Sequence, residues 1–303
     1  MATKDCVYTN TDKEYQEICD FLDTLATKDP CMLWESGRTN FWRHTVHAEK
    51  DPEGSWFREN VHVWRGADDQ MVALFISEYG EDDFFIEVMP AYRHIYPDIF
   101  RWIYDNWATS RTTIEIDVFS DDAEKIRRLL GEGFELKVHS ENLRAYDLDE
   151  VELAYELEDG FHVQAFSESM DFDSRVALVR SAFDNPGYTE ARVRGMMASP
   201  DYVDAYNLVV VSPEGRHVAY CVGWHERADP QAGYIEPVGT HANFRRRGFA
   251  TAVIRECFAR MKANGVRTVE IASGAEPNIS NFLYDSLGPK SKREVHKYAK
   301  AVS

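Results

Sequence analysis

The two halves of the chain carry the same order of short segments, about 150 residues apart. Five pairs of segments form this repeat: Met71–Ser77 and Val218–Trp224, Phe84–Val88 and Gly233–Pro237, Ala91–Arg93 and Asn243–Arg245, Ile114–Ile116 and Val269–Ile271, and Ala123–Phe134 and Ile279–Pro289. A period of this length is too long for a solenoid, so it indicates two duplicated domains. We predict domains at 1–150 and 151–303, with their junction in the acidic stretch Asp147–Gly160.

The second half has the hydrophobic patterns of a single α/β domain. Short apolar or alternating runs predict strands over 161–166, 207–211, 218–224, 234–240, 268–272 and 295–301. Apolar residues at helical spacing predict helices over 169–183, 189–197, 249–264 and 278–287. Ser212–Gly215 has the composition of a hairpin turn, and Gly265 is expected to end the helix over 249–264.

Three arginines and a glycine, Arg245–Gly248, lie where the strand over 234–240 passes into the long helix. The first backbone N–H groups of a helix have no partner within it, and the helix dipole adds partial positive charge there. Gly248 has no Cβ, so the backbone can approach a ligand closely. In a chain of net charge −18, this cluster indicates an anion site. The alternative is a basic first turn on a surface helix.

These residues resemble the acyl-CoA pyrophosphate loop of the GNAT superfamily of N-acetyltransferases. The loop of that family reads Arg/Gln-x-x-Gly-x-Gly/Ala, and this chain has Arg245–Ala250 in that pattern. A second family motif, Asn-x-x-Ala-x-x-Leu-Tyr-x-x-x-Gly-Phe, is matched about thirty residues later at four positions: Asn278, Leu283, Tyr284 and Gly288. The chain departs from it at Asn281, where the family has a small residue, and at Pro289, where it has phenylalanine.

The resemblance implies an α/β (α+β) fold of two tandem GNAT-like domains, each a mixed, mostly antiparallel sheet flanked by helices. It also implies acetyl-CoA as co-substrate and no metal. In the family, the strand before the loop separates from its neighbour and its backbone pairs with the pantetheine arm. The residues that the resemblance assigns to acetyl-CoA are Val238, Gly239, Thr240, Arg245, Arg246, Arg247, Gly248, Phe249, Ala250, Thr251 and Asn278.

Two residues are candidates for the chemistry of acetyl transfer. Tyr284 matches the family tyrosine that protonates the CoA thiolate, and its alternative is a packed aromatic side chain. Glu236 is the candidate general base, because it alternates with Tyr234 and Val238 on one strand face. Several family members place this glutamate two residues earlier, so an ion pair with an arginine is an equal alternative for Glu236. Asn278 is also in the position of a helix N-cap.

The first half of the chain differs from the second at the positions of the arginine–glycine loop and of Tyr284. Aligned on Arg93 and Arg245, Tyr96 replaces Gly248 and Pro97 follows it. One arginine remains of three, and Leu129 falls at the position of Tyr284. A side chain at the glycine position would crowd the phosphates, so we expect only the second half to bind acyl-CoA. Core packing is the favoured interpretation of six tryptophans in the first half, with a cleft or domain interface as the alternative: Trp34, Trp42, Trp56, Trp64, Trp102 and Trp107.

Composition limits the partners and the compartment. An excess of 52 acidic over 34 basic residues argues against nucleic acid and suits a cationic amine, although solubility alone also explains it. We expect a cytoplasmic protein without a membrane anchor, because the chain has no membrane-spanning apolar run, no signal-peptide pattern and five cysteines without a C-x-x-C pair. His44 and His47 lack further ligands, so zinc is not expected.

The leading hypothesis is an acetyl-CoA-dependent N-acetyltransferase that acts on a small-molecule primary amine by direct transfer. One alternative is a non-catalytic acyl-CoA sensor or scaffold, and another is a transferase of a different acyl group. A degenerate copy followed by an intact one is similar to the architecture of the mycothiol synthase family, but no motif points to the substrate of that family. A homodimer stays open.

Overall fold

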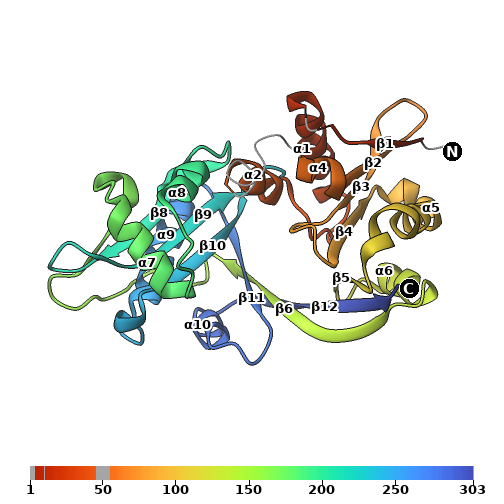
Figure 1. The fold of residues 1–303 in the computed structure, drawn as a ribbon. Helices are drawn as coiled ribbons and strands as arrows, with labels where there is room; N and C mark the ends of the chain where they lie inside the picture. Colours follow the sequence, from red (N-terminus) through yellow and green to blue (C-terminus); the bar gives the residue numbers. More distant parts are fainter. Residues whose placement is uncertain (1–3, 10, 46–54, 303) are drawn as a thin grey trace. The chain divides into compact units, whose positions relative to one another are not determined.

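The computed structural model describes residues 4–9, 11–45 and 55–302 (Figure 1). The chain divides into two compact units. Unit 1 comprises the described residues within 1–39, 50–141 and 293–303, and unit 2 those within 40–49 and 142–292. The units differ from two continuous halves because the last strand belongs to unit 1 and residues 142–150 belong to unit 2. The division into sequence copies at 1–150 and 151–303 stays a prediction.

Unit 1 is a mixed sheet with helices packed on it, in the strand order β1-β2-β3-β4-β5-β12-β6. The pairs β1–β2, β2–β3, β3–β4 and β5–β12 are antiparallel, and β4–β5 is parallel. Its elements are β1 (Lys4–Val7), α1 (Asp12–Ala26), the start of α2 (Ser36–His44), α4 (Ser55–Asn60), β2 (Val61–Arg65), β3 (Met71–Ile76), β4 (Asp83–Val88), α5 (Tyr96–Trp102), β5 (Thr113–Phe119), α6 (Ala123–Gly131), the start of β6 (Glu135–Asp147) and most of β12 (Ser291–Ala301).

The sequence of unit 1 explains its local structure. Helix α1 begins at a capping box, in which the Glu14 N–H donates to the Thr11 hydroxyl and the Thr11 N–H donates to the Glu14 carboxylate. Strand β3 is buried along its whole length, as its unbroken apolar sequence indicates. Trp34, Trp64 and Trp107 are buried in this unit, which supports core packing for these tryptophans.

Unit 2 has the strand order β6-β11-β10-β9-β8-β7. The pairs β7–β8, β8–β9 and β9–β10 are antiparallel, and β10–β11 is parallel. Its further elements are β7 (His162–Ala165), α7 (Phe172–Phe183), α8 (Glu190–Met197), β8 (Tyr202–Val211), β9 (His217–His225), β10 (Ala232–Thr240), α9 (Phe249–Ala263), β11 (Thr268–Gly274) and α10 (Ser280–Ser286). The mixed, mostly antiparallel sheet with flanking helices confirms the predicted fold class.

Two apolar cores lie on opposite faces of the unit 2 sheet. One core contains the apolar side of α9, where Phe249, Val253, Cys257 and Met261 are buried as their helical spacing predicts. The other core contains side chains of α7 and α8 together with Tyr220, Val222 and Trp224 of β9. Trp42, a fourth tryptophan of the first half of the sequence, is buried in unit 2. All five cysteines of the chain are free thiols, and three of them are buried.

The two units repeat one topology. In each, a run of antiparallel strands leads into one parallel pair, β4–β5 in unit 1 and β10–β11 in unit 2. The five pairs of repeated sequence segments fall on corresponding elements, for example Met71–Ser77 on β3 and Val218–Trp224 on β9. No helix among residues 4–9, 11–45 and 55–302 is long and apolar enough to cross a membrane.

Candidate functional site

The parallel strands β10 and β11 separate before either of them ends. Their pairing consists of Ala232–Thr268, Gly233–Val269 and Tyr234–Glu270, whereas the strands continue to Thr240 and Gly274. Over the same stretch β10 stays paired with β9, through Val238–Cys221, Gly239–Tyr220 and Thr240–Ala219. The edge of β10 from Val238 to Thr240 therefore faces β11 without a backbone ladder. This is the separation that the resemblance implied for the strand before the loop.

A local irregularity changes which face of the sheet each residue of β10 occupies. The register with β9 shifts between Ile235 and Val238, around the cis Glu236–Pro237 peptide bond. A one-residue shift exchanges the faces of all following side chains. Tyr234 accordingly packs in the core of α7 and α8, whereas Val238 packs with Ile235 against the core of α9. The prediction that Tyr234, Glu236 and Val238 share one face was wrong for Val238.

The loop after β10 presents unpaired backbone N–H groups at the start of α9. The first helical hydrogen bond runs from the Ala252 N–H to the Gly248 carbonyl, so the N–H groups of Phe249, Ala250 and Thr251 precede the helical ladder. Gly248 has φ +80° and Arg246 has φ +65°. A Cβ at Gly248 would meet no atom within 4 Å. The backbone conformation therefore favours glycine there, and the space in front of it is open.

The three arginines of the loop have different surroundings. Arg245 donates to the Ala182 carbonyl at 2.9 Å and to the Thr240 carbonyl at 3.4 Å. Arg247 forms an ion pair with Glu158, and its guanidinium lies 4.9 to 5.3 Å from the ring centres of Phe161, Phe244 and Phe249. Both side chains hold the loop in place.

Arg246 is exposed and makes no hydrogen bond or ion pair with the residues that the structure describes. Its positive φ turns the backbone at the centre of the arginine run. Within the loop, Arg246 is thus the arginine whose charge is available to an anion, beside the N–H groups of 249–251.

Helix α10 brings the second motif to the same end of the sheet. The Asn278 side chain accepts hydrogen bonds from the Ser280 N–H at 3.0 Å and from the Ser280 hydroxyl at 2.7 Å, so it holds the first residue of α10, although the N-cap position itself is occupied by Ile279. Tyr284 is 7% exposed, and the hydroxyl of Tyr146 donates to its backbone carbonyl at 2.8 Å. The backbone of α10 is thereby held at Ser280 and at Tyr284.

Tyr284 and Glu236 influence each other electrostatically. Burial first of all, and then the nearby Cys221 thiol and Glu236 carboxylate, raise the pKa of Tyr284 to about 12, while Arg144 opposes this rise. Glu236 is exposed on β10, and its backbone carbonyl accepts a hydrogen bond of 2.6 Å from the Trp224 indole. The structure therefore brings the two candidate catalytic residues to one place, with the phenol protonated at neutral pH.

A buried arginine that was not predicted from the sequence connects β11 with α10. Arg144 lies on the part of β6 that belongs to unit 2 and contacts Ser273 on β11 and Asn281 and Asp285 on α10. The signal in the sequence was Asn281, which replaces the small residue of the family motif. Asn281 is 1% exposed, and its amide oxygen accepts from Arg144 and Ser273.

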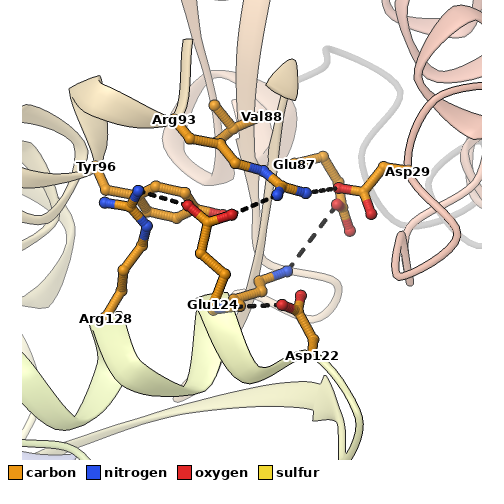
Figure 2. A pocket seen from close by; sticks show the side chains of 9 residues that line it. Asp29, Glu87, Val88, Arg93, Tyr96, Asp122, Glu124 and Arg128 are labelled. Carbon is orange, nitrogen blue, oxygen red and sulfur yellow. Dashed lines mark hydrogen bonds and ion pairs between the residues drawn. The ribbon is translucent and has the colours of Figure 1, made fainter. Parts of the chain in front are cut away.

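The corresponding region of unit 1 is filled by its own side chains (Figure 2). Arg93, the counterpart of Arg245, lies between Asp29 at 2.7 Å and Glu124 at 2.6 Å. Tyr96, at the position of Gly248, is 6% exposed at the first residue of α5. Pro97 follows it and has no N–H group to offer. The remaining cavity has a volume of about 10 Å³, which is room for a single water molecule at most.

A buried carboxylate completes this network in unit 1. Glu87 is 2% exposed, and it accepts hydrogen bonds from the N–H groups of Leu33 at 3.1 Å and Trp34 at 3.0 Å. The Lys125 ammonium lies 4.0 Å from it. Burial raises the pKa of Glu87, and the charge of Lys125 opposes that rise. Glu87 thus binds neighbouring groups in the interior of unit 1, whereas its counterpart Glu236 is exposed.

Metal ligation finds no support in the described part of the chain. Within residues 4–9, 11–45 and 55–302, no group of three His, Cys, Asp or Glu side chains is arranged to hold a metal ion. His47, one of the two histidines considered for zinc, lies outside the described residues.

Comparison with known proteins identifies one segment of unit 2. Residues 180–288 match the profile of the Acetyltransferase (GNAT) family. This segment is a GNAT acetyltransferase domain. It contains the separated strands, the loop of Arg245–Gly248 and Tyr284, and it makes the chain an acyltransferase. A search of curated proteins found no significant match.

Solved structures show the tandem GNAT fold over the whole chain. A tandem GNAT protein from the clavulanic acid biosynthesis pathway, solved without AcCoA, is 12% identical with a TM-score of 0.72, over 100% of this chain and 99% of that one. A GCN5-related N-acetyltransferase from Sphaerobacter thermophilus is 19% identical with a TM-score of 0.66, over 99% and 96%. A GNAT acetyltransferase from Colwellia psychrerythraea is 9% identical with a TM-score of 0.64, over 99% and 100%.

Proposed function

We propose that this tandem GNAT protein is an acetyl-CoA-dependent N-acetyltransferase whose second GNAT domain transfers acetyl directly to a small-molecule primary amine. The observation that carries the proposal is the early end of the β10–β11 pairing at Tyr234–Glu270, in a strand whose following loop leads to the unpaired N–H groups at the start of α9. A separated strand edge suits an extended amide-containing chain, and a helix N-terminus suits a pyrophosphate.

Binding of acetyl-CoA divides between backbone and side chains. The N–H groups of 249–251 and the guanidinium of Arg246 are suited to the pyrophosphate, since they combine hydrogen-bond donors with positive charge. The edge of β10 from Val238 to Thr240 is suited to the amides of the pantetheine arm. Arg245 and Arg247 contribute by holding the loop, and Asn278 by accepting hydrogen bonds from Ser280, the first residue of α10.

The reaction needs a neutral amine and a protonated leaving group. Glu236 accepts the proton of the substrate ammonium, directly or through water, and the amine nitrogen attacks the thioester carbonyl carbon. The new C–N bond forms, the C–S bond breaks, and the thiolate takes the phenolic proton of Tyr284. The nitrogen then gives its surplus proton to the Tyr284 phenolate, and Glu236 releases the first proton to solvent. The raised pKa of Tyr284, about 12, keeps that proton in place until charge develops on sulfur.

The acceptor is a cationic small molecule in this proposal. The exposed Glu236 is suited to receive a cationic amine, and the net charge of −18 favours the approach of cations. The first GNAT domain carries no acyl-CoA in the proposal, because Arg93, Tyr96 and Glu87 fill the equivalent region.

An acceptor screen tests the proposed function. Purified full-length protein is incubated with acetyl-CoA and a panel of primary amines, and free thiol release is read together with acetylated product by mass spectrometry. The proposal expects turnover with at least one amine and none with Gly248→Asp. Binding of acetyl-CoA without turnover on any amine would favour a sensor, and turnover only with another acyl-CoA would reassign the acyl group.

A further inference from the structure

Arg144 is a fully buried arginine whose three guanidinium nitrogens are all engaged. Its side chain is 0% exposed. The Nε donates to Asp285 at 2.6 Å, Nη1 donates to the Ser273 hydroxyl at 2.8 Å, and Nη2 donates to the Asn281 amide oxygen at 2.8 Å. A buried cation persists only when such partners compensate its desolvation, so losing it would leave several polar groups without partners.

These contacts join the two elements that form one wall of the candidate site. Ser273 lies in the end of β11 that no longer pairs with β10. Asn281 and Asp285 lie on α10, on either side of Tyr284. The Asn281 amide also donates to the Gly274 carbonyl at 3.1 Å. The free end of β11 is thus bound to α10 and Arg144 instead of to β10.

The same strand fixes α10 at a second point. Tyr146 lies two residues after Arg144 on β6, and its hydroxyl donates to the backbone carbonyl of Tyr284. Arg144 and Tyr146 therefore hold α10 at Asn281, Asp285 and the backbone of Tyr284, although the sequence repeat assigned this strand to the degenerate copy. The positive charge of Arg144 also favours the phenolate form, because it acts to lower the pKa of Tyr284.

We propose that Arg144 is a positioning residue for Tyr284, holding α10 against the end of β11 so that the phenol keeps one orientation toward the opening between β10 and β11. This inference rests on the proposed function of Tyr284 as the general acid. In this proposal β6, the last strand of the degenerate sequence copy, contributes to catalysis through Arg144, which contacts neither substrate. An acid that loses its orientation transfers its proton less efficiently, while binding of the cofactor is unaffected.

A double-mutant cycle on full-length protein tests the coupling. Arg144→Gln alone is expected to lower kcat by about 10-fold to 100-fold with little change in the KM for acetyl-CoA. In a Tyr284→Phe background the same substitution is expected to have no further effect on kcat, because the group it positions is already gone. Multiplying effects would overturn the proposal, since Arg144 would then act independently of Tyr284.

A second variant covers poor folding of Arg144→Gln. Ser273→Ala removes one hydroxyl partner and keeps the guanidinium, so it is expected to lower kcat by a few-fold, again only when Tyr284 is present. Thermal unfolding of each variant shows that the compared proteins are folded. Wild-type kcat in Ser273→Ala and in a folded Arg144→Gln would contradict positioning.

Hydrogen exchange separates this inference from the proposed function. Arg144→Gln is expected to speed amide exchange in α10, Ser280–Ser286, while α9 keeps its protection. If exchange in α10 is faster and the protein acetylates no amine, the proposed enzymatic function is wrong, but the conclusion that Arg144 holds α10 stands. Unchanged exchange in α10 would reject the positioning. If Tyr284→Phe keeps wild-type kcat, both Tyr284 as acid and Arg144 as its positioning residue are wrong.

Discussion

Tyr284 has a buried ring, and in the proposed mechanism its phenolic O–H supplies the proton for the thiolate. Replacing it with phenylalanine keeps the ring, so the packing of α10 should survive while the O–H is lost. We predict that Tyr284→Phe lowers kcat and kcat/KM alike, by about 10²-fold, because a thiolate is already a fair leaving group. Steady-state kinetics with any accepted amine checks this. A raised KM for acetyl-CoA with normal kcat would instead make Tyr284 a binding residue.

Glu236 offers a second test at the level of one residue. Its side chain is exposed at the site, and its charge raises the pKa of Tyr284. We predict that Glu236→Gln lowers turnover most at low pH, where few substrate amines are neutral without help, and leaves acetyl-CoA affinity nearly unchanged. Loss of a general base typically costs about 10²-fold to 10⁴-fold. A pH–rate profile within a few-fold of wild type throughout would remove Glu236 as the base.

The start of α9 is the element on which we expect the affinity for acetyl-CoA to depend. We predict that Arg246→Ala weakens acetyl-CoA binding by about 10-fold at low salt and less at high salt, since an exposed charge is screened by ions. Arg246→Lys should retain most of the affinity. Arg247→Ala is the contrasting variant, because Arg247 already pairs with Glu158 and should affect stability more than the salt dependence of binding. Titration at two ionic strengths compares them. Equal salt dependence in Arg246→Ala and wild type would contradict the assignment.

At the scale of elements, local patterns predicted most of the second domain. The helix over 249–264 and the hairpin around Ser212–Gly215 follow from apolar spacing and turn residues, and the structure has α9 and the β8–β9 hairpin there. The face of Val238 was mispredicted because a register shift depends on pairing with β9, which strand periodicity does not encode. Helix α10 was predicted from a motif, but its attachment was not.

Contacts between residues far apart in the sequence could not be predicted for the candidate site. Arg144 is about 140 residues before its partners on α10, and nothing local marks it as one of them. The pairing of β12 with β5 belongs to the same class, because it joins the end of the chain to residues 113–119. Only the unusual Asn281 in the family motif hinted that a polar partner had to be present.

Two buried histidines, one in each unit, make the stability of the folded protein depend on pH. Burial lowers the pKa of His62 to about 4, with Asp5 opposing, and burial together with Arg175 lowers the pKa of His217 to about 4. Their folded pKa lies below the unfolded value of about 6.5, so the unfolded chain takes up protons first as the pH falls. We predict that stability is fully present above pH 6.5 and is lost progressively toward pH 4.

Thermal unfolding across this pH range measures the effect. His62 stacks on Trp102 with ring centres 4.0 Å apart, so His62→Gln should lose stability at neutral pH but show a shallower decline between about pH 6.5 and 4. Substituting the exposed His162 should leave the slope as it is. An identical slope in His62→Gln and wild type would show that the pKa of His62 is the same in the folded and unfolded states, which would contradict the prediction.

The central claim concerns the whole molecule: of two GNAT domains, only the second binds acetyl-CoA, at the start of α9. Calorimetric titration of the full-length chain with acetyl-CoA tests it most directly. We predict one site per chain, abolished by Gly248→Asp, which places a negative charge at the pyrophosphate in a space that a Cβ can enter without a clash. Gly248→Asn is the matched control, since asparagine tolerates the same positive φ without a charge and should retain part of the affinity. Two sites per chain, or unchanged affinity in Gly248→Asp, would contradict the account.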